Sequence, residues 1–140
     1  MTIKTERITL DTAPGVQVTD ITGQIGKLLE RSGLQEGLAT VFVPGSTATV
    51  TTIEYEPGLV ADITAALDRV APTDSRYEHD KRWHDGNGHS HVRASFLKPS
   101  VTIPFSHNTL MLGTWQQIVF IELDVRPRNR TIVVQFIGDQ

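Results

Sequence analysis

The chain has 140 residues, a size typical of one domain, and a net charge of −3 from 13 basic and 16 acidic side chains. This mild acidity argues against bulk electrostatic binding to nucleic acid, and no apolar stretch is long enough for a membrane span. The absence of cysteine excludes disulfides, cysteine-ligated zinc and a thiol nucleophile. Since the N-terminal residues lack an apolar signal region, we expect one cytoplasmic domain over residues 1–140.

The first half of the chain alternates predicted strands with two predicted helices. Apolar residues at helical spacing mark the first helix, which Thr19 or Asp20 would cap and Gly33 would end in the left-handed conformation. Pro57 suits the first turn of the second helix, and Pro72 follows its end. Strands are predicted over residues 3–10, 38–43 and 47–53, and helices over residues 18–29 and 59–70.

The second half reads as strands with no helix between them. Neighbouring strands with short connections pair mostly antiparallel. The sequence therefore predicts a mainly β, α+β fold, with a large, mostly antiparallel sheet or sandwich and two helices on one side. The strands of this half are predicted over residues 92–97, 101–105, 117–123 and 131–137.

Four of the five histidines fall between His79 and His91. Neutral imidazole is the commonest protein metal ligand and also titrates close to pH 7. If a strand begins near His91, then His89 and His91 share one face of it and can hold a single divalent ion, with His79 as a third ligand. The same histidines would suit proton transfer without a metal, and a polar surface loop is the remaining interpretation. Asp85 is a candidate oxygen ligand or supporting group.

Two further segments could bind phosphate. Ser46 and Thr47 follow Gly45 after an apolar strand, where backbone N–H groups and hydroxyls can hold an anion, although a plain turn is the alternative. The run from Arg126 to Arg130 is either a solvated hairpin tip or a source of guanidinium groups.

The last group of candidates lies around the predicted strand over residues 117–123. Glu122 and Asp124 would share a face of this strand with apolar residues. Because an unpaired carboxylate is costly to bury, that face is either exposed to solvent or the two carboxylates pair with arginines. Trp115, just before the strand, is either a core residue or a platform for substrate.

The chain resembles the YjbQ-like family, often described as secondary thiamine-phosphate synthases. The resemblance covers nearly the whole length. It is carried by three runs: Tyr77-Glu78-His79, Asn87-Gly88-His89-Ser90-His91-Val92-Arg93-Ala94-Ser95, and Leu110-Met111-Leu112-Gly113-Thr114-Trp115-Gln116 with Glu122 downstream.

Some positions match recurring polar residues of the family, and two depart from its pattern. His79, His91 and Glu54 match such recurring residues. Gly45 stands where many members have a histidine, so His89 or His84 would have to replace that side chain. Asn108 stands where a glycine is usual, a milder change because Asn tolerates the left-handed conformation.

The resemblance implies a compact, mainly β homotrimer that joins a hydroxymethylpyrimidine diphosphate to a thiazole phosphate. The corresponding hypothesis is an enzyme with a phosphorylated small substrate, no organic cofactor, and a zinc or magnesium ion on His79, His89 and His91. In it, His79, His91, Glu54 and Glu122 would be catalytic, while Ser46, Thr47, Arg93, Arg126 and Arg128 would bind phosphate. Metal-assisted hydrolysis and a non-catalytic binding protein are the alternatives, and neither nucleic acid nor a membrane is expected as a partner.

Overall fold

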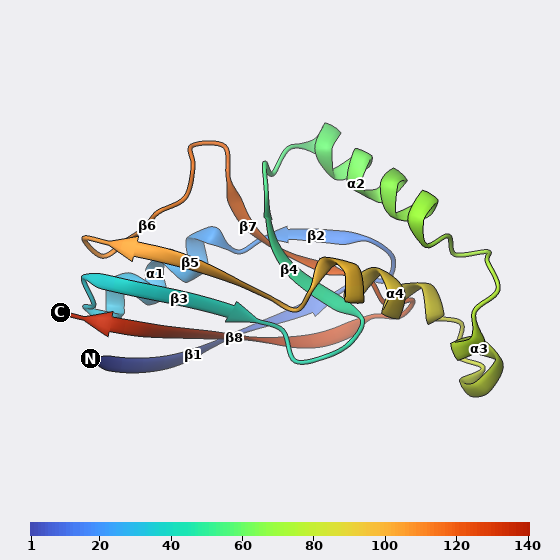
Figure 1. The fold of residues 1–140 in the computed structure, drawn as a ribbon, viewed down its shortest axis with the longest axis horizontal. Coiled ribbons are helices and arrows are strands. Elements are labelled where there is room, and N and C mark those ends of the chain that lie inside the picture. The colour runs from blue at the N-terminus through green and yellow to red at the C-terminus, as the bar shows by residue number, and fades with distance from the viewer.

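The computed structural model of the protein describes residues 1–140 and has an α+β fold of two antiparallel sheets and four helices (Figure 1). The strands are β1 (Thr2–Thr12), β2 (Gln17–Asp20), β3 (Glu36–Phe42), β4 (Ala48–Ile53), β5 (Ser100–Ser106), β6 (Thr109–Leu110), β7 (Gln117–Glu122) and β8 (Arg128–Asp139). The helices are α1 (Thr22–Ser32), α2 (Pro57–Val70), α3 (Glu78–Trp83) and α4 (Gly88–Leu97).

Every strand pairing is antiparallel. The larger sheet has the order β1-β8-β3-β5-β6, and the smaller one has the order β2-β7-β4. Long β8 pairs with β1 over its whole length on one side and with β3 on the other. This arrangement confirms the predicted mainly antiparallel α+β fold.

The main core lies between the inner faces of the two sheets and α1. Strand β8 alternates as a half-buried strand should, with Ile132, Val134 and Phe136 buried and the residues between them more exposed. Phe105 of β5 meets Phe136 edge to face, with ring centroids 6.1 Å apart. The alternation of period two in the sequence thus fixes which face of the large sheet is buried.

A second, smaller core covers the other face of the small sheet. Strand β7 is buried on both sides: Ile118 and Phe120 face the main core, and Val119 and Ile121 pack under α2 and α4. The molecule therefore has three layers, with β7 in the middle one (Figure 1).

The strand predicted over residues 92–97 is wrong, because these residues belong to helix α4. The face that α4 buries is made mostly of small or polar side chains, among them Ser90, Arg93 and Ala94. Without a stripe of large apolar residues, the helical period does not appear in the sequence. The short helix α3, which buries none of its residues, has no such stripe either.

The other two helices follow the sequence more closely. Helix α1 ends at Gly33, with φ of 74°, as predicted, but it begins only at Thr22, whose N–H donates to Asp20 Oδ1 at 2.9 Å. Residues 17–20 form β2 instead of a first helical turn. Helix α2 begins at Pro57 and ends at Val70, as predicted. None of the four helices is long and apolar enough to cross a membrane.

Candidate functional site

Three segments that are distant in the sequence meet at one end of the two sheets. They are the loop between β3 and β4, the loop between β7 and β8, and the start of α4. Asp124 ties them together, since its Oδ2 accepts from Thr47 Oγ1 at 3.0 Å and its Oδ1 accepts from Asn87 Nδ2 at 3.3 Å. The fold therefore carries the histidine segment on a polar network anchored in the sheets.

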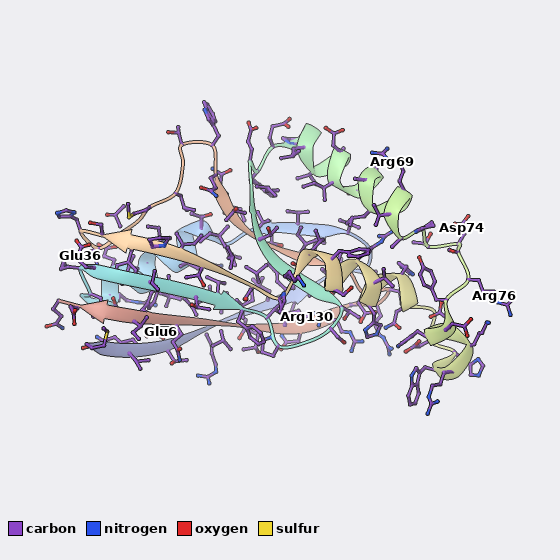
Figure 2. The ribbon with its side chains drawn as sticks, in the orientation of Figure 1. Glu6, Glu36, Arg69, Asp74, Arg76 and Arg130 are labelled. Carbon is purple, nitrogen blue, oxygen red and sulfur yellow. The ribbon has the colours of Figure 1, made fainter.

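A buried ion pair lies at this end of the main core. Glu122 accepts from Arg130 Nε at 2.8 Å and from Arg130 Nη2 at 2.5 Å, and Thr12 Oγ1 donates to the same carboxylate at 2.6 Å. Figure 2 shows Arg130 beside the β3–β4 loop, where its Nη2 also bonds Thr47 Oγ1 at 2.8 Å. Of the two environments predicted for Glu122 and Asp124, the arginine-paired one is correct.

Both carboxylates of this network stay ionised. Burial acts to raise the pKa of Asp124, but hydrogen bonds from the Val125 N–H, Arg128, Asn87 and Thr47 outweigh it and lower the pKa to about 2. The pKa of Glu122 is lowered in the same way, since Arg130 and Thr12 outweigh its burial. Glu122 also accepts from two backbone N–H groups, so this carboxylate has no free oxygen to act as a base.

A histidine and two aspartates converge at α3. The Nδ1 atom of His79 lies 3.6 Å from Asp80 Oδ1 and 3.5 Å from Asp85 Oδ1. Both distances exceed hydrogen-bond length, and this Nδ1 is buried without any hydrogen-bond partner. Asp80 Oδ1 also accepts from the Gly88 N–H at 2.8 Å, which fixes α3 against the start of α4. We refer to His79, Asp80 and Asp85 as the His-Asp group.

His91 joins the His-Asp group to a small cavity. Its ring centroid lies 4.4 Å from that of His79. His91 also lines a cavity of 190 Å³ together with Gly45, Ser46, Ala48, Ala94, Ser95 and Pro99. Burial and the neighbouring His79 lower the pKa of His91, so its imidazole is neutral at pH 7 and can accept a proton or a cation.

His89 lies apart from this pair. Residues two apart on a helix point about 200° away from each other, so His89 and His91 diverge instead of sharing a face. His89 is buried near Tyr77, with ring centroids 6.2 Å apart. Burial, reinforced by the charge of Arg93, lowers the pKa of His89. The structure thus does not bring His89 to the His-Asp group.

The family model described as "UPF0047 protein YjbQ-like" matches residues 6–139. The chain belongs to this family. A UPF0047 protein of Methanothermobacter thermautotrophicus is 39% identical over 138 residues, which cover 99% of this chain and 94% of that protein. The UPF0047 protein YugU of Bacillus subtilis is 32% identical over 124 residues, covering 87% and 90% of the two chains.

Solved structures show the same fold. A hypothetical protein from Aeropyrum pernix has a TM-score of 0.90 at 34% identity, covering 97% of this chain and 99% of its own. A YjbQ-like protein of unknown function from Sulfolobus solfataricus has a TM-score of 0.88 at 30% identity, covering 99% and 100%. The UPF0047 fold therefore extends over the whole chain.

Several of the predicted site residues lie elsewhere in this UPF0047 chain. Glu54 is exposed beyond the far end of β4, six residues of strand away from Thr47, a separation of roughly 20 Å. Arg93 is buried under α2, where its Nε donates to the Ala71 carbonyl at 3.0 Å and its Nη2 to Asp68 at 2.9 Å. Trp115 is 74% exposed, which excludes the core role.

The remaining predicted phosphate-binding residues lie near the cavity or on the adjacent loop. Ser46 lines the cavity, and the Thr47 hydroxyl is already engaged by Asp124 and Arg130. Arg128 pairs with Asp124 through Nε at 2.9 Å and Nη2 at 2.6 Å, and Arg126 is exposed on the β7–β8 loop.

Sequence reasoning did not single out Asp80, Asn87 or Arg130 as site residues of this UPF0047 protein. Asp80 directly follows His79, and its role depends on the helical turn of α3 that carries both side chains to Asp85. Arg130 lies in the same basic run as Arg126 and Arg128. Its position on β8, in phase with buried Ile132 and Val134, is the signal that separates it from the exposed arginine.

Proposed function

We propose that this UPF0047 protein is an enzyme that uses a divalent cation to act on a phosphorylated small molecule, with the cation held by the His-Asp group. The observation that carries the proposal is the buried Nδ1 of His79, which has no hydrogen-bond partner and faces two carboxylate oxygens. A buried polar atom without a partner is costly, and a cation would satisfy it.

The spacing of the ligand atoms fits a small metal ion. With metal–ligand bonds of about 2.1 Å, tetrahedral ligand atoms lie roughly 3.4 Å apart, close to the 3.5 and 3.6 Å that separate His79 Nδ1 from Asp85 and Asp80. The nitrogen ligand favours zinc over magnesium, which prefers oxygen ligands and retained water. His91 is close enough to His79 to serve as a further ligand after a rotation of its ring, or as a base beside the metal.

The residues around the cation would then have different roles. The neutral imidazole of His91 would take up or deliver a proton at the wall of the cavity that Ser46 also lines. The bound cation would supply positive charge to a leaving phosphate or diphosphate. Glu122 would act as a positioning residue, since it fixes Arg130 and, through it, the β3–β4 loop.

The finer proposal is the transfer that the family resemblance implies, which joins a hydroxymethylpyrimidine diphosphate to a thiazole phosphate with release of diphosphate. It is supported by the position of His91 between the His-Asp group and the cavity. Metal-assisted hydrolysis of a phosphate ester would use the same ligands. A non-catalytic binding protein is the second candidate, favoured by the small cavity of 190 Å³ and by the full pairing of Glu122 and Asp124.

The first experiment measures metal content per chain in protein purified without a polyhistidine tag. We expect near-stoichiometric metal in the native chain and its loss in His79→Ala and Asp85→Ala. His84→Asn is the matched control, because His84 is exposed at the end of α3 outside the His-Asp group and Asn tolerates its left-handed backbone, with φ of 57°. Native protein that stays metal-free even with added zinc would refute the cation site.

The second experiment tests turnover of the two thiamine precursors and of a panel of phosphate esters, with and without added zinc or magnesium. Cation-dependent turnover that His91→Ala abolishes would support an enzyme, and the substrate turned over would separate transferase from hydrolase. Binding of these compounds without any chemical change would support the non-catalytic candidate.

We also propose that the chain works as a homotrimer, as the family resemblance implies. An apolar groove on α2 and α4 supports an assembly, because it has no polar lining and leaves Val70 and Phe96 more than half exposed. Its lining residues are Ile63, Ala66, Leu67, Val70, Phe96 and Leu97. Light scattering coupled to size-exclusion chromatography measures the state directly.

A further inference from the structure

The loop between β6 and β7, residues 111–116, presents two large apolar side chains to solvent. Trp115 is 74% exposed and Met111 is 62% exposed. No aspartate, glutamate, lysine or arginine lies between Lys98 and Glu122, so the surface of this loop is uncharged. Exposed apolar side chains that lie close together on an uncharged loop are suited to an apolar partner surface.

Hydrogen bonds and packing hold the β6–β7 loop in one shape. The Gly113 N–H donates to Gln116 Oε1 at 3.0 Å, and the Gln116 N–H donates back to the Gly113 carbonyl at 3.1 Å. Gln116 Nε2 also donates to Thr52 Oγ1 at 3.0 Å, which attaches the loop to β4. Leu112 packs against the main core. Because the loop is already ordered, binding through it costs little conformational entropy.

The apolar groove on α2 and α4 is a concave surface of matching character. Its volume is 460 Å³, within the roughly 300–1,000 Å³ of pockets that enclose a small ligand, so it has room for side chains of a partner. All of its lining residues are hydrophobic. Figure 1 shows the β6–β7 loop and α2 on the same side of the sheets but standing apart, so the loop does not fill the groove of its own chain.

We propose that Trp115 and Met111 of one chain insert into the apolar groove on α2 and α4 of the next chain. This inference rests on the proposed homotrimer and deepens it by naming the two surfaces that meet. Each chain then supplies one loop and one groove, and head-to-tail contacts of this kind close into a ring. Phe96 and Leu97 of the groove belong to α4, which also carries His91, so each loop would pack against the helix of its neighbour's candidate site.

The area available to this contact fits the centre of a larger interface. An aromatic side chain buries roughly 150–250 Å² when it leaves solvent completely, so Trp115 and Phe96, at 74% and 62% exposure, would bury roughly 200–300 Å² together. A stable interface buries about 800 Å² on each partner, and a few central aromatic side chains provide most of its binding energy. The remaining area would come from the polar residues that flank the loop and the groove.

The test places the photoreactive residue p-benzoylphenylalanine at the position of Trp115, which keeps a large apolar side chain there. Light scattering first gives the oligomeric state of the native chain. Irradiation of the variant should then link chains in pairs, and mass spectrometry should locate the link on residues 63–70 or 96–97 of the second chain. The same residue in place of Trp83, which is 62% exposed on α3, is the matched control and should link no chains.

Trp115→Ala provides a second measurement, because a change at an exposed side chain rarely perturbs folding. We expect its trimer to dissociate at protein concentrations at least about tenfold higher than the native trimer does, and Trp83→Ala to behave like the native chain. Links within one chain, between two loops or outside the groove would overturn the contact, as would a Trp115→Ala trimer as stable as the native one. A native chain that is monomeric at every concentration would overturn the homotrimer together with the contact.

Discussion

At the scale of single residues, the buried Glu122–Arg130 pair stabilises the end of the fold that carries the candidate site. Glu122→Gln keeps the shape of the side chain but leaves the Arg130 charge buried without its counter-ion. Breaking a buried pair in this way costs about 3–5 kcal/mol of the free energy of unfolding, measured by urea denaturation. The control is Glu6→Gln, an exposed change on β1 (Figure 2), which should stay within about 0.5 kcal/mol of the native chain. Equal stability of the two variants would contradict this account.

Asp124 predicts how stability responds to acid. Its pKa is about 2 in the folded chain against an ordinary value of 3.8, so the unfolded chain binds more protons between these values. Its contribution, about 2 kcal/mol by linkage, is complete above the unfolded pKa and is lost as the pH falls through the folded one. Unfolding free energies measured from about pH 5 down to about pH 2.5 should therefore fall less steeply in Asp124→Asn than in the native chain. Asp74→Asn, at an exposed carboxylate after α2 (Figure 2), is the control and should keep the native slope.

At the scale of elements, the contact between α3 and α4 holds the His-Asp group together. A Cβ on Gly88 would lie 2.6 Å from Tyr77 Cβ and 3.0 Å from Asp80 Oδ1, so Gly88→Ala must push α3 away from α4. We expect a loss of about 1–3 kcal/mol in stability together with reduced metal content. Gly23→Ala in α1 meets no atom within 4 Å and should instead stabilise the chain by up to about 1 kcal/mol. Destabilisation by both changes alike would argue against the packing explanation.

The same elements show how far the sequence predicts the site. Apolar and β-branched runs bounded by turn residues located most strands, and proline and glycine located the start of α2 and the end of α1. The pattern failed at α4, whose packed face is built from Ser90, Ala94 and a buried arginine, and a His-x-His pair on a strand became two divergent side chains on a helix. The histidine cluster lies in the candidate site, but the approach of His79 to Asp85 depends on the α3 turn, and no periodicity in the sequence indicates that turn.

At the scale of the molecule, the apolar core that stabilises the fold and the residues of the candidate site lie in different places. The main core between the sheets is apolar and ends in the Glu122–Arg130 pair, so one end of both sheets is held rigidly. Asn87 and Thr47 attach the candidate site to that end through Asp124. Helix α2 lies on the opposite side of α4 from the β3–β4 loop (Figure 1), and none of the residues that line the apolar groove also lines the cavity.

The apolar groove on α2 and α4 predicts where the chains of the proposed trimer contact one another. Val70 and Phe96 are 61% and 62% exposed in a groove without polar lining, an arrangement more typical of an interface than of a free surface. We expect the double variant Val70→Lys/Phe96→Lys to shift a trimer to monomers in light scattering, because two buried, unpaired charges cost several kcal/mol at each contact. Ile3→Lys, also at a side chain 61% exposed but on β1, should leave the trimer intact. A trimer that survives the double change would place the interface elsewhere, and the exposed Trp115 would then be the next side chain to replace.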